Sequence, residues 1–421
     1  MKIYKFGGAS VKNAEGVKNV AQIISRDAES SSILVVISAM GKSTNALEKI
    51  INAYFHGNAE LTELIQEFKS FHEEIIKDLF QENTPIWMNE VYNLMLELEC
   101  LLDNENLHED FDFIYDQIVV FGELISTRIV SGYLLKQGII NQWIDSRNFI
   151  STDSRHRDAR VQWEDTERIV KNRLLPLSQK KLIIAQGFIG KGEKGESTTL
   201  GREGSDYSAA IFGKLLNAES VTIWKDVPGV MNADPKKFQN TKLIDNLSFN
   251  DAIELAYYGA SVIHPKTIQP LKASNIPLNV RSFLDTEARG TCVSDNFSSS
   301  EITSKIHKDK QILLEISTRD YTFIAEDSLS FILSTLLENK VRMNIMQNSA
   351  IQFNCVIDDR ENQHQRLIKT LNEHFNVEVK TGLQLVTLYG KGNETDKKEI
   401  SAMGEILLEQ NIGQVTHHLM R

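Results

Sequence analysis

Residues 198–206 carry the side chains best suited to bind an anion. This stretch contains two glycines, Arg202 and Asp206, and an apolar run with helical character follows it. Glycines let backbone N–H groups approach a ligand, and a helix N-terminus offers unpaired donors with a partial positive charge. The stretch therefore predicts an anion-binding loop. A simple helix cap at Asp206 fits the same residues equally well.

A lysine and a glycine pair near the N-terminus form a second candidate. Lys5 lies in a strand-like run that ends at Gly7 and Gly8, and residues 11–24 then have the spacing of a helix. A lysine beside an opened backbone reaches a phosphate as a point charge. The spacing is not that of a Walker loop, so a surface lysine beside a turn is an equal alternative.

Two further features point to chemistry. Ser38 and Thr44 lie in a small polar loop after the apolar strand 33–37, at the kind of strand end where open α/β sheets bind ligands. Glu123 lies in the apolar helical stretch 119–126. A buried carboxylate costs free energy unless it meets a cation, so Glu123 predicts either a structural ion pair, which the residues alone favour, or a ligand ammonium.

The elements that would position these residues alternate between strands and helices. Apolar strand-like runs separated by helical segments predict an α/β fold with a mostly parallel sheet. The polar stretch 295–310 is typical of a linker. After it, the order strand, helix, strand, strand, helix, strand predicts a small α+β module over residues 311–379, and an abbreviated copy follows over residues 383–420.

Composition excludes several classes of protein. A chain of 421 residues predicts two or three domains. The net charge of −11 and a pI near 5.5 give no electrostatic footprint for nucleic acid and oppose anionic membranes. The three cysteines lie far apart without CxxC spacing, which predicts no disulfide framework or zinc cluster and favours a reducing cytoplasm. No apolar run approaches the roughly 18 residues of a membrane span.

Four of the stretches together resemble one family, the aspartokinases. They are residues 5–8, 121–126, 198–206 and 259–267, which occur in the family's order over nearly the whole chain. The resemblance implies ATP-dependent phosphorylation of the side-chain carboxylate of L-aspartate, with Mg²⁺, as the first step of lysine, threonine and methionine biosynthesis. It also implies a homodimer or higher homo-oligomer and an amino-acid feedback effector.

The resemblance implies a domain plan as well. Residues 1–295 would form an αβα sandwich with a mostly parallel central sheet, of the amino-acid-kinase or carbamate-kinase type. A linker would span residues 296–310. Two small ferredoxin-like ACT modules would follow at residues 311–380 and 381–421. The second module stops early at Arg421, so we expect its final strand to be missing or borrowed from a neighbour.

Roles follow from matching positions. Lys5 would neutralise the transferring phosphoryl group, Asp206 would orient Lys5, and Arg202 would hold the substrate α-carboxylate. The assigned substrate contacts are Ser38, Thr44, Glu123, Arg202 and Ser205, with Glu123 taking the ammonium. The assigned nucleotide contacts are Lys5, Gly7, Gly8, Lys225, Asp226, Met231, Lys236 and Ser261. No side chain is assigned to a metal ion. The attacking carboxylate is ionised at neutral pH, so no general base is expected.

Departures from the family pattern fall mainly on the nucleotide side. The family's usual residues differ at five positions, which are Glu203, Lys225, Met231, Lys236 and Ser261. Residues 344–349 also differ from those of lysine-sensitive members, which leaves the effector open. Two alternatives to an aspartate kinase follow from these departures: a catalytically inactive amino-acid sensor, and a kinase for another amino acid such as glutamate.

Overall fold

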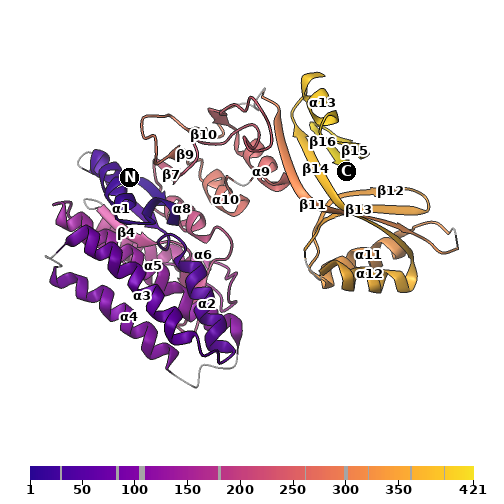
Figure 1. Cartoon of the computed structure of the whole chain (residues 1–421). Coiled ribbons are helices and arrows are strands. Elements are labelled where there is room, and N and C mark those ends of the chain that lie inside the picture. The colour runs from indigo at the N-terminus through magenta and orange to yellow at the C-terminus, as the bar shows by residue number, and fades with distance from the viewer. Residues whose placement is uncertain are drawn as a thin grey trace. The chain divides into compact units, whose positions relative to one another are not determined.

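The computed structural model describes the chain in ten segments (Figure 1). They are residues 1–28, 31–81, 85–103, 110–178, 182–260, 262–297, 302–320, 322–360, 363–392 and 394–421. The chain divides into two compact units. The first comprises Met1–Val230, Leu243–Ile253 and Val262–Ser299, and the second comprises Met231–Lys242, Glu254–Ser261 and Ser300–Arg421.

The first unit is built on an eight-stranded sheet. Its strand order is β3-β4-β2-β1-β7-β9-β10-β8, and every pair is parallel except β9 with β10. The strands are β1 (Lys2–Phe6), β2 (Ile33–Ile37), β3 (Asn141–Trp143), β4 (Leu182–Gln186), β7 (Ser220–Lys225), β8 (Asn246–Leu247), β9 (Leu278–Ser282) and β10 (Thr291–Val293). The mostly parallel sheet confirms the predicted fold class.

Helices alternate with these strands along the chain. They are α1 (Ala14–Ala28), α2 (Ser43–Phe55), α3 (Leu61–Phe80), α4 (Asn89–Leu102), α5 (Phe111–Lys136), α6 (Trp163–Ile169), α7 (Leu175–Ser178), α8 (Gly204–Leu215), α9 (Phe249–Tyr258) and α10 (Pro265–Ala273). A separate hairpin, β5 (Ile189–Lys191) with β6 (Ser197–Thr199), leads into α8. Helices α2 to α5 lie together in Figure 1, and α8 packs against α10 and against β1, β2 and β7.

The alternation of side chains along β1 directs Lys5 toward α8. Tyr4 and Phe6 belong to the hydrophobic core that includes residues of α1 to α5. Because successive side chains of a strand point to opposite faces, Ile3 and Lys5 face the other layer. Gly213 of α8 shows this packing, since a Cβ atom there would lie 4.0 Å from Ile3. The fold therefore brings a basic strand residue against the first turn of α8.

Helix α5 is long and apolar enough to cross a membrane, but 89% of its most apolar window is buried inside the protein. Its first residues are capped by Asp110, whose carboxylate accepts a hydrogen bond from the Asp112 N–H at 2.9 Å. The helix packs against α1, α2, α4 and strands β2, β3 and β4. It is therefore the central core helix of the first unit.

The second unit contains a six-stranded antiparallel sheet of order β12-β13-β11-β14-β16-β15. Its strands are β11 (Ser304–Ser317), β12 (Met343–Asn348), β13 (Gln352–Asp358), β14 (Asn376–Tyr389), β15 (Ile406–Ile412) and β16 (Val415–Met420). Its helices are α11 (Glu326–Glu338), α12 (Gln363–His374) and α13 (Glu394–Ser401). Strands β11 and β14 are long enough to serve both predicted ACT-type modules.

The start of β11 completes the second module. Residues 304–308 pair with residues 385–389 of β14, whose other neighbour is β16. Four strands are thus present, although we expected the fourth to be missing or borrowed. The added strand comes from a segment that we expected to be linker. Val386 and Leu388 of β14 pack with Ala233 and Phe238 of the 231–242 segment and with Ile400 of α13.

Candidate active site

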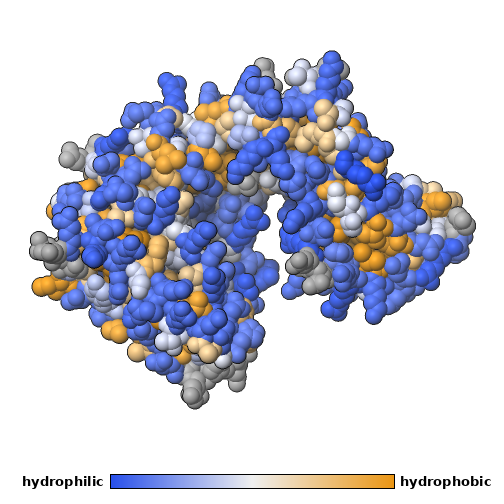
Figure 2. Space-filling view, viewed as in Figure 1, coloured by the Kyte–Doolittle hydropathy of each residue, from blue (hydrophilic) through white to orange (hydrophobic). Residues whose placement is uncertain are grey.

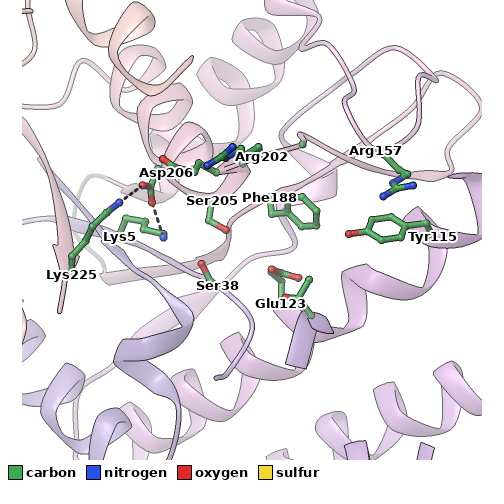
Figure 3. A pocket seen from close by; sticks show the side chains of 14 residues that line it. Lys5, Ser38, Tyr115, Glu123, Arg157, Phe188, Arg202, Ser205, Asp206 and Lys225 are labelled. Atoms are coloured by element: carbon green, nitrogen blue, oxygen red, sulfur yellow. Dashed lines mark ion pairs between the residues drawn. The ribbon is translucent and has the colours of Figure 1, made fainter. Parts of the chain in front are cut away.

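A cavity of about 480 Å³ lies in the first unit, at the carboxyl ends of β1, β2, β4 and β7 (Figure 3). All five predicted substrate contacts line it, namely Ser38, Thr44, Glu123, Arg202 and Ser205. Lys5, Asp206 and Lys225 line it as well. Tertiary structure thus collects residues that lie up to about two hundred positions apart in the sequence, because parallel strands present their carboxyl ends at one edge of the sheet.

Two lysines share one buried carboxylate in this cavity. Lys5 Nζ lies 2.6 Å from Asp206 Oδ1, and Lys225 Nζ lies 3.4 Å from Asp206 Oδ2. Asp206 is only 2% exposed. Burial by itself would raise the pKa of Asp206, but the two ammonium groups hold that pKa below its usual value. The carboxylate therefore stays charged and fixes both lysines at the cavity wall, as the dashed lines in Figure 3 show.

Helix α8 begins earlier than the sequence predicted. Its N-cap position is Glu203, which has left-handed backbone angles and makes no capping hydrogen bond through its side chain. Asp206 lies inside the first turn, so the helix cap at Asp206 that the sequence allowed is not formed. Gly201 and Glu203 both take positive φ, and the chain enters the helix three residues sooner.

Glu123 is almost completely buried and one of its oxygens has no partner. Its Oε1 accepts a 3.3 Å hydrogen bond from the Ala39 N–H, whereas Oε2 has no hydrogen-bond partner among the described residues. Burial raises the pKa of Glu123 to about 8. The ion pair that the residues alone favoured is not formed within the described part of the chain. The carboxyl group therefore lines the cavity with one oxygen that has no protein partner in the described part of the chain.

The stretch 121–126 also holds the loop after β2 in place. Ser126 donates a hydrogen bond of 2.7 Å to the carbonyl oxygen of Ser38. A Cβ atom at Gly122 would lie 3.0 Å from Ala39, so the glycine lets helix and loop approach closely. Glu123 and Ser38 are thereby held close together in the lining of one cavity.

Glycines also allow close approach at the loops that follow β1 and β4. A Cβ atom at Gly8 would lie 2.7 Å from the Ala39 carbonyl oxygen, and one at Gly7 would lie 3.4 Å from Lys5 Nζ. Gly8 therefore makes room for the neighbouring backbone, whereas a side chain at Gly7 would make only ordinary contact. Both glycines were predicted as nucleotide contacts, and neither lines the cavity. At Gly187, which follows β4, a Cβ atom would lie 2.4 Å from Ser205.

Three further predicted nucleotide contacts, Asp226, Met231 and Lys236, are not among the residues that line this cavity. Asp226 is exposed at the end of β7. Met231 and Lys236 belong to the second unit. Ser261 lies outside the described residues.

Four residues of the site escaped the sequence analysis. Tyr115, Arg157 and Phe188 line the cavity, with the Arg157 guanidinium 4.5 Å from the centre of the Tyr115 ring. Asp116 is fully buried beside them and accepts hydrogen bonds from Arg157 N–H, His156 Nδ1 and Thr199. A signal existed for Asp116, because an acid seven residues before Glu123 lies on the same face of an apolar helix.

Comparisons with known proteins identify the family. The family model described as "Amino acid kinase family" matches residues 1–282. Lysine-sensitive aspartokinase 3 of Escherichia coli (strain K12) is 30% identical over 396 residues, which cover 92% of this chain and 86% of that protein. The chain belongs to the aspartokinases of the amino acid kinase family. Aspartokinase 1, chloroplastic, of Arabidopsis thaliana is 32% identical over 88% of this chain and 66% of its own length.

Solved aspartokinase structures have the same fold. E. coli aspartokinase III in complex with lysine and aspartate superimposes with a TM-score of 0.83 at 28% identity, covering all of this chain and 96% of that one. The structure of the same enzyme in complex with aspartate and ADP gives equal values. The aspartokinase fold therefore extends through both units of this chain.

Proposed function

We propose that this aspartokinase transfers the γ-phosphoryl group of ATP to the side-chain carboxylate of L-aspartate, producing 4-phospho-L-aspartate. The relatives named above are aspartokinases, and the two solved E. coli structures contain aspartate, one of them with ADP. The chain spans most of the E. coli relative, and charged side chains line its cavity.

One observation carries the proposal. The same cavity is lined by a buried glutamate with an unpaired oxygen, Glu123, and by lysine and arginine side chains. Aspartate has an ammonium and two carboxylates, so a matching site needs one anionic and at least two cationic positions. Glu123 provides the first, through its unpaired oxygen. Arg202 suits the α-carboxylate, because a guanidinium binds a carboxylate through two parallel hydrogen bonds. Neutral hydroxyl groups also line the cavity, on Ser38, Thr44 and Ser205.

Lys5 and Lys225 would act on the phosphate side. Phosphoryl transfer depends mostly on positioning and on neutralising charge at the phosphoryl oxygens. Asp206 keeps both ammonium groups at the cavity wall before the nucleotide arrives, so little reorganisation is needed during transfer. The first turn of α8 adds backbone N–H groups that favour an anion. The substrate carboxylate attacks in its ionised form, so the chain need not remove a proton.

Mg²⁺ would accompany the nucleotide. When bound, it neutralises phosphate charge and orients the phosphates for attack. The described residues contain no cluster of side chains that could hold a metal ion by itself, so the nucleotide phosphates and water would supply most of its ligands. Of the nucleotide contacts assigned by resemblance, Lys5, Gly7, Gly8, Lys225 and Asp226 belong to the first unit. Contacts from Met231, Lys236 and Ser261 stay predictions of the resemblance.

The second unit would regulate the first. We assign it to a pair of ACT modules that bind an amino-acid effector. The E. coli relative is named lysine-sensitive and was solved with lysine, but residues 344–349 here differ from those of lysine-sensitive members.

The domain division at about residue 295 belongs to this proposal. So does a cytoplasmic location, which the free cysteines favour.

Self-association is also proposed, through the second unit. Leu333 and Leu337 of α11 are exposed, as are Phe323 and Met346. Figure 2 shows an apolar patch over α11 and α12. Exposed apolar patches of this kind commonly mark protein interfaces, and a homodimer or higher homo-oligomer would cover this one.

A coupled assay of ADP release with a panel of amino acids tests the proposed reaction. We expect turnover with L-aspartate and Mg-ATP, and far less with L-glutamate. Turnover with glutamate alone would reassign the substrate. Absence of turnover with every amino acid, together with effector binding seen by calorimetry, would identify an inactive sensor instead.

A further inference from the structure

We propose that His72 is a positioning residue for substrate binding, because it holds the start of helix α2, and with it Thr44, through the side chain of Ser43. The inference rests on the proposed kinase function and adds to it a residue outside the cavity. His72 belongs to α3, and none of the described residues that line the cavity lies on that helix.

The loop of residues 38–42 enters α2 without a side-chain cap of its own. The N-cap position is Lys42, whose side chain makes no capping hydrogen bond. Thr44 lies in the first turn and lines the cavity. The first turn of a helix has unpaired backbone N–H groups, and the side chain of the N-cap residue usually fixes it. The position of Thr44 therefore depends on contacts from elsewhere in the fold.

His72 makes such a contact from α3. Its Nε2 lies 3.2 Å from Ser43 Oγ, and its Nδ1 lies 2.8 Å from the carbonyl oxygen of Phe68. His72 is 0% exposed and Ser43 is 3% exposed. The rings of Phe68 and Phe71 pack against the imidazole, with centroids 4.5 Å and 5.0 Å away. The imidazole is thus fixed in the core with one nitrogen directed at the start of α2.

The protonation of His72 follows from these partners. A carbonyl oxygen only accepts hydrogen bonds, so Nδ1 carries the proton. Burial lowers the pKa of His72 to about 4, so the ring is neutral at pH 7 and Nε2 can only accept. The Ser43 hydroxyl is a donor within its reach. That hydroxyl also lies 2.6 Å from the Met40 carbonyl oxygen, which already accepts from the Ser43 N–H at 2.9 Å. The hydroxyl therefore links α3 to the loop.

The other contacts of this loop fix its beginning. The Ser38 N–H donates to the Phe6 carbonyl oxygen, and the Gly41 N–H donates to the Gly8 carbonyl oxygen, both at 3.0 Å. These bonds act before α2 begins, whereas the contact from His72 acts at its first residue. Loss of that contact should therefore displace Thr44 and leave Ser38 in place. The competing explanation is that the imidazole only fills space in the core.

The test compares two amides at position 72. His72→Gln places its amide near the position of Nε2 and keeps a contact with Ser43. His72→Asn places its amide near the position of Nδ1, so it keeps the bond to Phe68 and loses the contact with Ser43. Ser43→Ala removes the same contact from the other side. Steady-state kinetics of the full-length proteins, with aspartate and Mg-ATP varied in turn, gives KM and kcat, and urea denaturation gives stability.

We expect the KM for aspartate to rise about threefold to tenfold in His72→Asn, the range that follows from the loss of one hydrogen bond, while kcat and the KM for ATP change by less than about twofold. His72→Gln should restore the KM for aspartate to nearly that of the parent. Ser43→Ala should raise it as much as His72→Asn does, and combining the two should raise it no further. Equal KM values in His72→Asn and His72→Gln would overturn the proposal, as would additive effects in the double variant.

Stability is followed separately because His72 lies in the core. A loss of stability in both amide variants with unchanged KM values would show that the imidazole only fills space. If His72→Asn does not fold, Ser43→Ala decides, since an unchanged KM for aspartate in that variant contradicts the proposal. The experiment also separates this inference from the proposed function. Absence of turnover in the parent would remove both, whereas a normal parent with equal KM values in the two amide variants removes only the role of His72.

Discussion

The Thr199 hydroxyl donates a 2.7 Å hydrogen bond to Asp116 Oδ1, and the Thr199 N–H donates one of 3.1 Å to Oδ2. These bonds join the core helix α5 to strand β6, which leads directly into the loop that carries Arg202. Asp116 lies two turns before Glu123 on the same helix. The substrate loop is therefore tied to the helix that presents the buried acid.

Replacing Asp116 with Asn should loosen this connection. The amide matches the carboxylate in shape, but its NH₂ group would face hydrogen-bond donors. We expect the free energy of unfolding to fall by about 1–3 kcal/mol, the usual cost of an unsatisfied buried group. The KM for aspartate should rise more than kcat falls. Urea denaturation and steady-state kinetics measure both, with Thr199→Ser as a control that keeps both bonds. An unchanged KM would show that the connection does not position Arg202.

Removal of either member of the Lys5–Asp206 pair should abolish most turnover. Lys5→Ala deletes a cation placed at the phosphoryl group, and we expect kcat to fall about 10²-fold to 10³-fold or more. Asp206→Ala releases both lysines and should have a similar effect. Lys2→Ala is the matched control, because Lys2 lies on the same strand but pairs with Asp27. Near-normal kcat in Lys5→Ala would refute the assigned role.

Aspartate binding should depend on pH through Glu123. The carboxyl group binds an ammonium only when ionised, and its pKa in the free protein is about 8. The KM for aspartate should therefore fall by roughly 25-fold as pH rises from about 6.5 to about 8.5, because the ionised fraction of the group rises from about 3% to about 76%. In Glu123→Gln the KM should be higher by about thirtyfold or more and almost independent of pH. A parallel pH profile in both proteins would assign the ammonium site elsewhere.

The stability of the unliganded protein should change with pH for the same reason. The pKa of Glu123 rises from 4.5 to about 8 on folding. Between these values the folded state holds more protons than the unfolded state, so the free energy of unfolding falls as pH increases. Glu123→Gln should remove this part of the slope. Urea denaturation of both proteins at a series of pH values measures it, and identical slopes would contradict the raised pKa.

Substituting Leu337 with Asp should weaken self-association. Leu337 is 78% exposed on α11, so its loss costs the isolated chain little stability. Ile140 of the first unit is 81% exposed and provides the control Ile140→Asp. Sedimentation velocity over a range of concentrations should show dissociation in the Leu337 variant alone. Dissociation of neither variant would place the interface on another surface.

The sequence by itself determined the elements and most of the site. Apolar runs and glycine turns predicted the strands that end at the cavity, because strand periodicity and turn chemistry depend on neighbours in the chain. The five substrate contacts were implied by the resemblance, and all five side chains line the cavity. The parallel sheet then collects those strand ends at one edge.

Only the tertiary structure decided the matters that depend on distant segments. Whether Glu123 meets a protein cation depends on every element packed around α5, and the described residues offer none. The start of α8 at Glu203 depends on backbone angles that no pattern of side chains records. The fourth strand of the second module comes from residues 304–308, about eighty positions before its partner strand. Long-range pairing of this kind is set by packing between segments, which local sequence does not encode.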